Sequence, residues 1–438
     1  MYILRILATA ICVVSGMYFG GWLHLLPWGV LVVLWMRAYE DVSHPCFWFP
    51  PIFFLYGVSF YIVVQSDSLP WTSSLTTDGE VHFASSMHLL ALAAFLIGAS
   101  RRVVKRRNSH LTFTMVDMRF AKAFLALTFL ISLYHFYSVF SFDGLLSKQD
   151  IRVAKSDSIG LRLAPIYVPM TALMSLVLIK LASESRHRMI KVGLFFACWG
   201  MVGLVVTGER DVMLRIAIAI GVIYSHMIFP VNRKVAALGI LAITLALPIL
   251  QALKGAVLGG VGDARLDLYG IFGGEFKSAG RTFTILLERW PGFQYGGTLW
   301  WDIQRLFSIG PLNSDVVSTS NWFNRVFLGN ENAGWGFTLV GELYLNFGMI
   351  FVFLVYALIG FTCYEVYRRQ GQSAFWLAGY AVLISTVLHS TRGDVATLVG
   401  TPLKLILVPL FATWLAGRLF RRGPTNRGMS NAQRVRTR

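Results

Sequence analysis

The acid with the strongest chemical prospects lies where the chain enters a long apolar segment. Glu342 stands in GELYLNFG, about one turn inside an apolar run that begins near Phe337, and Asn346 follows on the same helical face. A carboxylate that enters lipid is costly, so it usually faces an interior cavity or a partner. Glu342 is therefore a candidate general base, a candidate ligand of substrate hydroxyls, or the ion-pair partner of an arginine.

Arginines form the second set of candidates. Several lie in segments that the charge pattern described below places on the outer side, against the usual excess of Lys and Arg on the inner side. A guanidinium makes bidentate, permanently charged contacts with phosphate, which a lipid-phosphate substrate would need. For any single arginine, snorkelling to ordinary headgroups is the alternative. The candidates are Arg210, Arg281, Arg289, Arg305 and Arg392.

Motifs for metals and nucleotides are missing from the sequence. It has no Walker or dinucleotide motif and no His-x-x-His or Cys-x-x-Cys pair, so we predict neither a metal nor a cofactor. The four cysteines lie in or beside apolar runs and predict no disulfide framework. The net charge of +17 gathers in certain loops and in the tail 417–438, so we predict membrane lipid as a partner and no nucleic acid.

A membrane bundle must position these residues. The 438 residues are 55% hydrophobic and only 14% charged, whereas soluble domains have about a quarter charged residues. We predict an all-α polytopic membrane protein with about 12 transmembrane helices (about 11–13), since roughly 20 apolar residues cross a bilayer. The spans are predicted near 3–20 (a retained first helix rather than a cleaved signal peptide), 22–36, 48–64, 83–100, 120–140, 163–182, 190–206, 211–229, 235–252, 337–362, 374–390 and 395–416.

Lys and Arg placement predicts the topology. Every short inner connection from 101–107 onwards is basic, whereas the outer loop 65–81 has no Lys or Arg. Both termini are then cytoplasmic and the long loop is outside. The predicted domains are a membrane bundle 1–252 of about nine spans, the large outer loop 253–336, a three-span bundle 337–416 and the basic, disordered cytoplasmic tail 417–438.

Two segments of the large loop have helical periodicity. In the segment 278–290, one helical stripe is apolar and consists of Phe283, Leu286, Leu287 and Trp290. In the segment 299–307, the apolar stripe consists of Leu299, Ile303, Leu306 and Phe307. Asp302 and Arg305 of the second segment are spaced i,i+3. Amphipathic helices of this kind can lie in the membrane interface with Trp at headgroup level. We expect them to wall a cavity at the outer surface.

The order of these elements resembles a known family. FQYGGTLWW follows an arginine and a proline, an arginine-bearing helix and a second proline come next, and GFTLVGELYLNFG opens a membrane helix after an Asn-rich stretch. With TGERD at 207–211, this resembles the bacterial oligosaccharide repeat-unit polymerases of Wzy type, including O-antigen polymerases. The Pro-Arg step of that family is not intact here, because the proline follows Arg305 by six residues in RLFSIGP.

The resemblance implies a glycosyltransferase of GT-C-like, metal-free type in the bacterial inner membrane. It would polymerise undecaprenyl-diphosphate-linked oligosaccharides at the periplasmic face, with the large loop periplasmic, and it would work with a flippase and a chain-length regulator. Catalysis then needs arginines that neutralise the diphosphate and a base or a positioned acceptor. We expect Glu342, Arg281 and Arg305 to be catalytic, with substrate contacts from Arg210, Arg392, Arg289, Tyr344, Asn346 and Asp302.

Two other functions stay open. An O-antigen ligase is expected to use a His in its large periplasmic loop, but 253–336 contains none and His389 is the nearby substitute. A flippase or exporter of lipid-linked oligosaccharide is expected to show internal symmetry, and this chain shows no repeat. Both alternatives rank below the polymerase.

Overall fold

A computed structural model describes most of the chain. The described residues are 2–66, 78–100, 111–113, 118–141, 159–160, 163, 166–207, 210–242, 272, 276–307, 318–329, 337–400, 402–403 and 407–419. Within them the fold is helical, and the one β-type pairing is an isolated parallel bridge between Thr112 and Ser373. The tail 420–438 and most of 243–275 fall outside this set.

The helices follow the apolar runs of the sequence. The N-terminal part forms α1 (Tyr2–Tyr18), η1 (Gly21–His24), α2 (Leu25–Met36), α3 (Pro45–Gln65), α4 (Asp78–Ala99), α5 (Met118–Phe140), α7 (Tyr167–Glu184), α8 (Arg186–Thr207) and α9 (Arg210–Met227). The C-terminal part forms α12 (Lys277–Glu288), α13 (Gly297–Phe307), α14 (Thr319–Leu328), α15 (Leu339–Arg369), α16 (Ala374–Ser390), α17 (Val395–Gly400) and α18 (Val408–Leu419).

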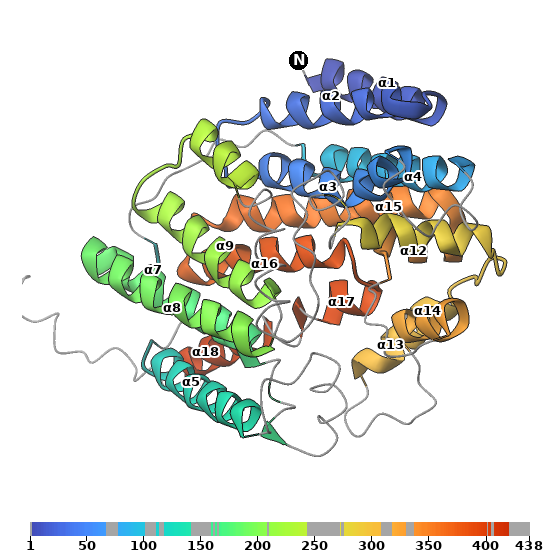
Figure 1. The fold of residues 1–438 in the computed structure, drawn as a ribbon. Helices are drawn as coiled ribbons and strands as arrows, with labels where there is room; N and C mark the ends of the chain where they lie inside the picture. Colours follow the sequence, from blue (N-terminus) through green and yellow to red (C-terminus); the bar gives the residue numbers. More distant parts are fainter. Residues whose placement is uncertain are drawn as a thin grey trace, which may run out of the picture.

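The long helices stack side by side in layers (Figure 1). The α1–α2 pair packs on α3 and α4; α4 packs on α15, and α15 on α16. Beyond α16 lie α9 and α7, followed by α5 and α8 (Figure 1). The C-terminal helices α15 and α16 are therefore inserted between the first and the middle helices of the chain, and segments distant in sequence meet in the centre.

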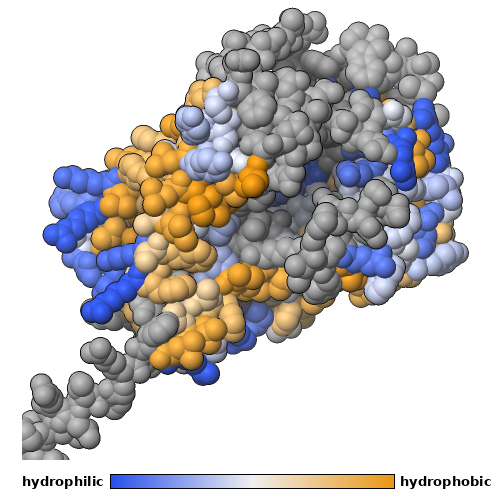
Figure 2. Space-filling model, turned by 90° about the horizontal axis from the view of Figure 1, so that it is seen from below, coloured by the Kyte–Doolittle hydropathy of each residue, from blue (hydrophilic) through white to orange (hydrophobic). Residues whose placement is uncertain are grey.

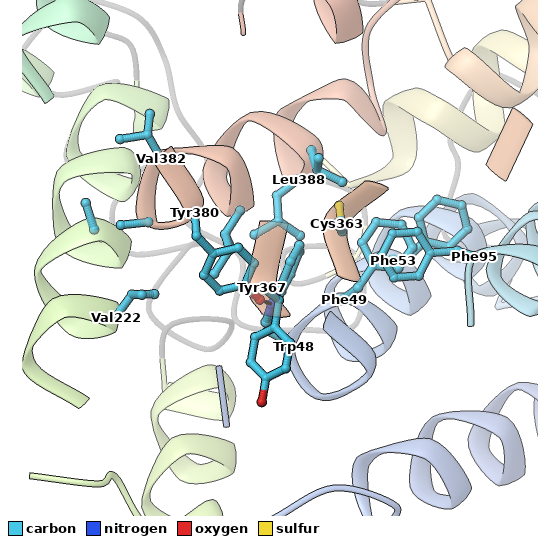
Figure 3. Close-up of a cluster of buried hydrophobic side chains, with 14 of the residues drawn as sticks. Trp48, Phe49, Phe53, Phe95, Val222, Cys363, Tyr367, Tyr380, Val382 and Leu388 are labelled. Carbon is cyan, nitrogen blue, oxygen red and sulfur yellow. Dashed lines mark hydrogen bonds between the residues drawn. The ribbon is translucent and has the colours of Figure 1, made fainter. Parts of the chain in front are cut away.

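Aromatic side chains fill this centre (Figure 3). The rings of Phe49 and Phe95 stack with centroids 3.7 Å apart, and Phe53 stacks on Phe49 at 4.9 Å. On the α16 side, the Trp48 indole N–H donates to the Tyr380 hydroxyl at 3.1 Å. Buried aromatic rings contribute large apolar areas, and a Tyr or Trp in such a core usually finds a polar partner, as these do.

Glycines bring α4 and α15 unusually close. A Cβ added to Gly98 would lie 2.0 Å from the carbonyl oxygen of Ala357, and one added to Gly360 would lie 2.1 Å from that of Phe95. Small residues let helix backbones approach in membranes, where association depends on close packing. This crossing fixes α15, and with it the site described below, against the N-terminal helices.

The two ends of the bundle separate the predicted inner and outer segments. At one end the Tyr367 hydroxyl donates to Asp41 Oδ2 at 2.6 Å, and the Thr112 hydroxyl donates to the Gln372 carbonyl at 2.9 Å. At the other end the Tyr61 hydroxyl donates to the Gly21 carbonyl at 2.8 Å. Segments predicted to be inner connections thus share one end, and Figure 2 shows a band of apolar side chains between more hydrophilic ends.

The helices identify a membrane protein, whereas the count of 12 spans stays a prediction. In the described part, four helices are long and apolar enough to cross a bilayer: α3, α4, α5 and α15. Shorter apolar helices occupy 2–18, 21–36, 213–227 and 374–390. The predicted span 235–252 is helical over 233–242 and then leaves the described residues.

The predicted span 395–416 is not a regular α-helix throughout. The chain forms α17 and α18, and Pro402, Leu403 and Leu407 between them have a π-helical conformation. Pro402 lacks the backbone N–H of a regular helix, which favours such a departure. Helix α17 begins at Val395, where the prediction placed the start of the span.

The predicted span 337–362 is also broken. Phe347 and Gly348 leave the helical conformation within α15, and Gly348 adopts φ 74° and ψ −166°, a region that is essentially open to glycine alone. The segment 339–346 is therefore a separate helical piece at an angle to the remainder of α15. Glu342 and Asn346 both lie on that piece.

Candidate functional site

Glu342 lies at the centre of a buried polar cluster. Its side chain is fully buried. Oε2 accepts the backbone N–H of Val395 at 2.7 Å, and Oε1 lies 3.2 Å from the Thr319 hydroxyl and 3.5 Å from the Thr298 hydroxyl. Both carboxylate oxygens are thus engaged by donors from α13, α14 and α17.

Asp302 lies on α13 and, like Glu342, binds both α14 and α17. Its carboxylate is fully buried; Oδ1 accepts the Thr319 N–H at 3.1 Å and Oδ2 accepts the Ala396 N–H at 3.2 Å. Two acids from distant segments therefore bind consecutive N–H groups at the start of α17. Unpaired N–H groups at a helix start favour carboxylate acceptors.

Asp394 caps α17 from its own chain. Asp394 Oδ1 accepts the Thr397 N–H at 2.9 Å and the Thr397 hydroxyl at 2.6 Å, and the side chain is 4% exposed. This is an N-cap, which typically stabilises a helix by ~1 kcal/mol. Three acids therefore surround the first turn of α17, and each has N–H donors.

Asn346 joins this arrangement to the turn before α13. Its Nδ2 donates to the Thr298 hydroxyl at 2.7 Å and to the Glu342 carbonyl at 2.8 Å, and its Oδ1 accepts the Gly296 N–H at 2.9 Å. The amide is fully buried. We call this set the carboxylate–amide cluster; it consists of Thr298, Asp302, Thr319, Glu342, Asn346 and Asp394.

The cluster brings together three of the predicted site residues, Glu342, Asn346 and Asp302. The Asp302 carboxylate binds backbone N–H groups of α14 and α17, and its i,i+3 pairing with Arg305 stays a prediction, since the Arg305 side chain lies outside the described residues. Glu342 has no exposed surface, and both of its carboxylate oxygens already accept hydrogen bonds from Thr298, Thr319 and Val395. It is suited to hold α13, α14 and α17 together.

Helix α13 turns its polar face inward. Thr298 and Asp302 are fully buried, whereas Trp300 is 58% exposed and Ile303 is 39% exposed. The prediction of an amphipathic helix at 299–307 is confirmed, and its apolar side faces out of the protein. This orientation is the one expected of a helix whose outer face meets lipid and whose polar face covers a site.

Helix α12 lies differently from the interfacial arrangement expected for 278–290. The Phe276 ring meets the Tyr56 ring at 5.0 Å, and a Cβ on Gly280 would lie 2.8 Å from that of Phe60. Both contacts advance by four residues, so α12 runs parallel to α3 along its length instead of across its end. The predicted stripe is real, because Phe283 and Leu286 are fully buried against the bundle.

The candidate arginines are spread over several elements. Arg281 is half-buried on α12, and Arg392 is half-buried in the turn before α17, two residues ahead of Asp394. Arg289 is exposed at the end of α12, and its Nη1 donates to the Phe327 carbonyl at 3.0 Å, which ties α12 to α14. Arg305 and Arg210 lie on α13 and at the start of α9, but their side chains fall outside the described residues.

Tyr344 points away from the cluster. Its ring packs against Phe83 and Phe283 at 5.5 Å and against Trp290 at 5.5 Å. It packs α15 against α4 and α12 and takes no part in the hydrogen bonds described for the carboxylate–amide cluster.

The C-terminal end of α12 carries an acidic residue that lies near a second acid on α4. Burial and then the negative charge of Glu80 raise the pKa of Glu288, and Arg289 partly offsets this rise in pKa. Glu80 lies in the first turn of α4.

In the described residues, no group of three or more His, Cys, Asp or Glu side chains is arranged to hold a metal ion.

Three members of the cluster escaped the sequence analysis. Thr298 and Thr319 are common polar residues without a distinctive pattern, and Asp394 lay in the short connection between the predicted spans 374–390 and 395–416. A usable signal existed for Asp394: Asp three residues before Thr, ahead of an apolar run, is typical of an N-cap. Helix α14 was missed too, although Ser318 accepts the Asn321 N–H at 3.2 Å as its cap.

Comparisons with known proteins support the resemblance. Residues 307–420 match the family model for O-antigen polysaccharide polymerase Wzy. The match spans α14 to α18, and thus Glu342, Asn346 and Asp394. Neither a curated protein nor a solved structure matches the chain. Residues 307–420 of this helical membrane protein are therefore similar to the O-antigen polysaccharide polymerase family Wzy.

Proposed function

We propose that this protein polymerises undecaprenyl-diphosphate-linked oligosaccharide repeat units at the periplasmic face of the bacterial inner membrane. The observation that carries the proposal is the family match over 307–420, which covers the break in α15 and two of the buried acids, Glu342 and Asp394. Both termini are cytoplasmic in this proposal, and the loop with α12, α13 and α14 is periplasmic. A flippase and a chain-length regulator act with it.

The break in α15 supports a site at the membrane surface. From Gly348 to Arg369 the helix has about 22 residues, which at ~1.5 Å per residue matches a hydrocarbon core of about 30 Å. The segment 339–346 then lies beside the first half of α4, where Tyr344 packs against Phe83 and the Thr338 hydroxyl lies 3.3 Å from the His88 ring. The carboxylate–amide cluster holds this segment against α13, α14 and α17.

The proposed reaction is glycosyl transfer. A hydroxyl oxygen of the incoming lipid-linked unit attacks the anomeric carbon of the growing glycan, the bond to the carrier diphosphate breaks with its electron pair on the diphosphate oxygen, and the hydroxyl proton passes to water. Negative charge develops on the leaving diphosphate, so positioned arginines stabilise the transition state. We assign this role to Arg281 and Arg305, with Arg210, Arg289 and Arg392 as further diphosphate ligands.

The acids have a different role in this proposal. Glu342 and Asp302 position α17, and with it the turn that carries Arg392, through the N–H groups of Val395 and Ala396. Asn346 positions the turn 293–297. We therefore replace the expectation of Glu342 as a general base by a positioning role, because its carboxylate is buried and hydrogen-bonded to the protein.

Replacing Arg281 by alanine is expected to stop chain extension while the protein still folds. The side chain is half-buried on α12, and loss of a charge-stabilising group of this kind typically reduces turnover by ~100-fold or more. Chain length on a gel of surface glycan measures the effect. Arg188→Ala is the matched control, since Arg188 is exposed at the opposite end of the bundle; normal chains from Arg281→Ala would exclude the diphosphate role.

Deleting the gene separates the three candidate functions. A strain without the polymerase is expected to carry surface core capped by a single repeat unit, because ligation and export still operate. Surface glycan is resolved on a gel, and the lipid-linked pool is extracted in parallel. Complete loss of even the single unit would instead indicate a ligase or a flippase and would overturn the proposal.

A further inference from the structure

The turn between α12 and α13 holds one residue in an unfavourable backbone conformation. Tyr295 has φ 45°, and in the described part of the chain it is the one non-glycine residue with positive φ. Its neighbours Gly292 and Gly296 have φ 86° and 92°. A Cβ disfavours this left-handed region, which glycine occupies freely, so glycine at 295 would suit the backbone better than tyrosine does.

Hydrogen bonds impose this conformation. The Gln294 N–H donates to the Leu345 carbonyl at 3.0 Å, the Gly296 N–H donates to Asn346 Oδ1 at 2.9 Å, and the Gly297 N–H donates to the Gln294 carbonyl at 2.8 Å. Leu345 and Asn346 are the last regular residues before the break in α15. The turn is thus fastened directly to the carboxylate–amide cluster, and the protein tolerates the strain at Tyr295 as part of that attachment.

The Tyr295 ring is presented to the outside. It is 77% exposed, and its centroid lies 6.1 Å from the ring of Phe293. The Phe347 ring adjoins the turn, since a Cβ on Gly296 would lie 3.4 Å from that ring. The backbone N–H of Trp300 donates to the Gly296 carbonyl at 2.9 Å. Phe293, Trp300 and Phe347 are also exposed, so a rim of aromatic rings surrounds the strained turn.

We propose that Tyr295 stacks on a saccharide ring of the lipid-linked substrate. This inference rests on the proposed function and specifies a contact for the glycan. A sugar ring has an apolar face of C–H groups that fits a flat, exposed aromatic ring. The residues on either side of Tyr295 are bonded to Leu345 and Asn346, in the segment 339–346.

The strain favours a ligand over a membrane anchor. Anchoring at headgroup level requires an aromatic side chain but no particular backbone conformation. Trp300 and Phe347 already offer exposed rings, and neither residue has a positive φ. Strained residues persist where the surroundings over-determine them, and such residues cluster at ligand sites. Tyr295 combines a strained backbone, an attachment to the cluster and high exposure.

The test uses the full-length protein in nanodiscs and three variants. Tyr295→Gly removes the ring and relieves the strain, Tyr295→Phe keeps the ring, and Tyr18→Ala removes an equally exposed tyrosine, 82% exposed, from the end of α1. The probe is the repeat-unit oligosaccharide released from the host strain's own surface glycan. Binding is measured by saturation-transfer difference NMR, and unfolding by heat.

We expect Tyr295→Gly to be at least as heat-stable as the wild type and to bind the oligosaccharide about tenfold more weakly, which corresponds to ~1.4 kcal/mol. Tyr295→Phe and Tyr18→Ala should bind within twofold of the wild type. Unchanged binding by Tyr295→Gly overturns the inference, and so does a loss of heat stability without a loss of binding, which would indicate membrane anchoring.

Complementation of the deletion strain separates this inference from the function on which it rests. A single-repeat cap in the deletion strain, together with shortened chains in Tyr295→Gly, supports both. A single-repeat cap with full chains and full binding in Tyr295→Gly overturns the Tyr295 contact alone. Full-length chains in the deletion strain itself overturn the polymerase function.

Discussion

Glu342→Ala is expected to abolish chain extension, whereas Glu342→Gln should retain most of it. Alanine leaves the buried Val395 N–H without an acceptor, which costs about 1–3 kcal/mol, and it also releases the Thr319 and Thr298 hydroxyls. Helix α17 and the turn with Arg392 then lose the attachment to Glu342 and keep the one to Asp302. Chain length in the complemented deletion strain measures the result.

Glutamine has the shape to take over the positioning contacts. Its amide oxygen can accept the Val395 N–H, and its NH₂ group can donate to the Thr319 hydroxyl, which lies 3.2 Å from the Thr298 carbonyl and can turn its own proton there. Exchanging a charged acceptor for a neutral one weakens the bond by roughly 1 kcal/mol.

The glutamine variant therefore decides between two roles for Glu342. A general base cannot be replaced by an amide, so an inactive Glu342→Gln that still folds would restore the catalytic role that the sequence suggested. Glu184→Ala serves as the control, because Glu184 is an exposed acid paired with Lys180. Thermal unfolding of each purified variant shows whether activity was lost through misfolding.

Gly348→Ala is expected to be the most damaging single-methyl change in the site. At φ 74° and ψ −166° an added Cβ strains the backbone by roughly 1–3 kcal/mol. The chain can escape that strain by continuing α15 as a regular helix, which swings the segment 339–346 away. Glu342 and Asn346 would then leave the cluster, and the Gln294 N–H would lose the Leu345 carbonyl.

The expected result is a lower unfolding temperature and no chain extension. Gly29→Ala is the matched control: Gly29 lies within the helix α2, a Cβ there meets nothing within 4 Å, and Ala is favoured over Gly in a helix by up to ~1 kcal/mol. Wild-type chain lengths from Gly348→Ala would show that the break in α15 is dispensable, and the argument for the position of the cluster would fail with it.

Part of the site could be predicted from sequence because it is local. The spacing of Glu342 and Asn346 places them on one helical face, and the structure confirms this: the Asn346 amide donates to the Glu342 carbonyl. The periodicities of 278–290 and 299–307 also predicted real helices. The side of α13 that faces inward was not predictable, since an apolar face packs equally well against protein or lipid.

The breaks in the membrane helices were harder to predict. GELYLNFG contains the glycine that interrupts α15, but glycine is also common inside uninterrupted membrane helices. The predicted span 395–416 does begin at Val395, but the acceptors that Asp302 and Glu342 supply to the first turn of α17 come from distant segments that hydropathy does not pair.

The sequence by itself determined the class of the protein, the family it resembles, and the acid and amide at the start of α15. The tertiary structure decided the partners of these groups. Glu342 binds donors from residues 298, 319 and 395, and Asp302 binds those of 319 and 396. Hydropathy records which side chains avoid water, and it is the same for a lipid-facing and a protein-facing residue. Which helices meet, and therefore which donors reach Glu342, depends on close packing between segments far apart in the chain.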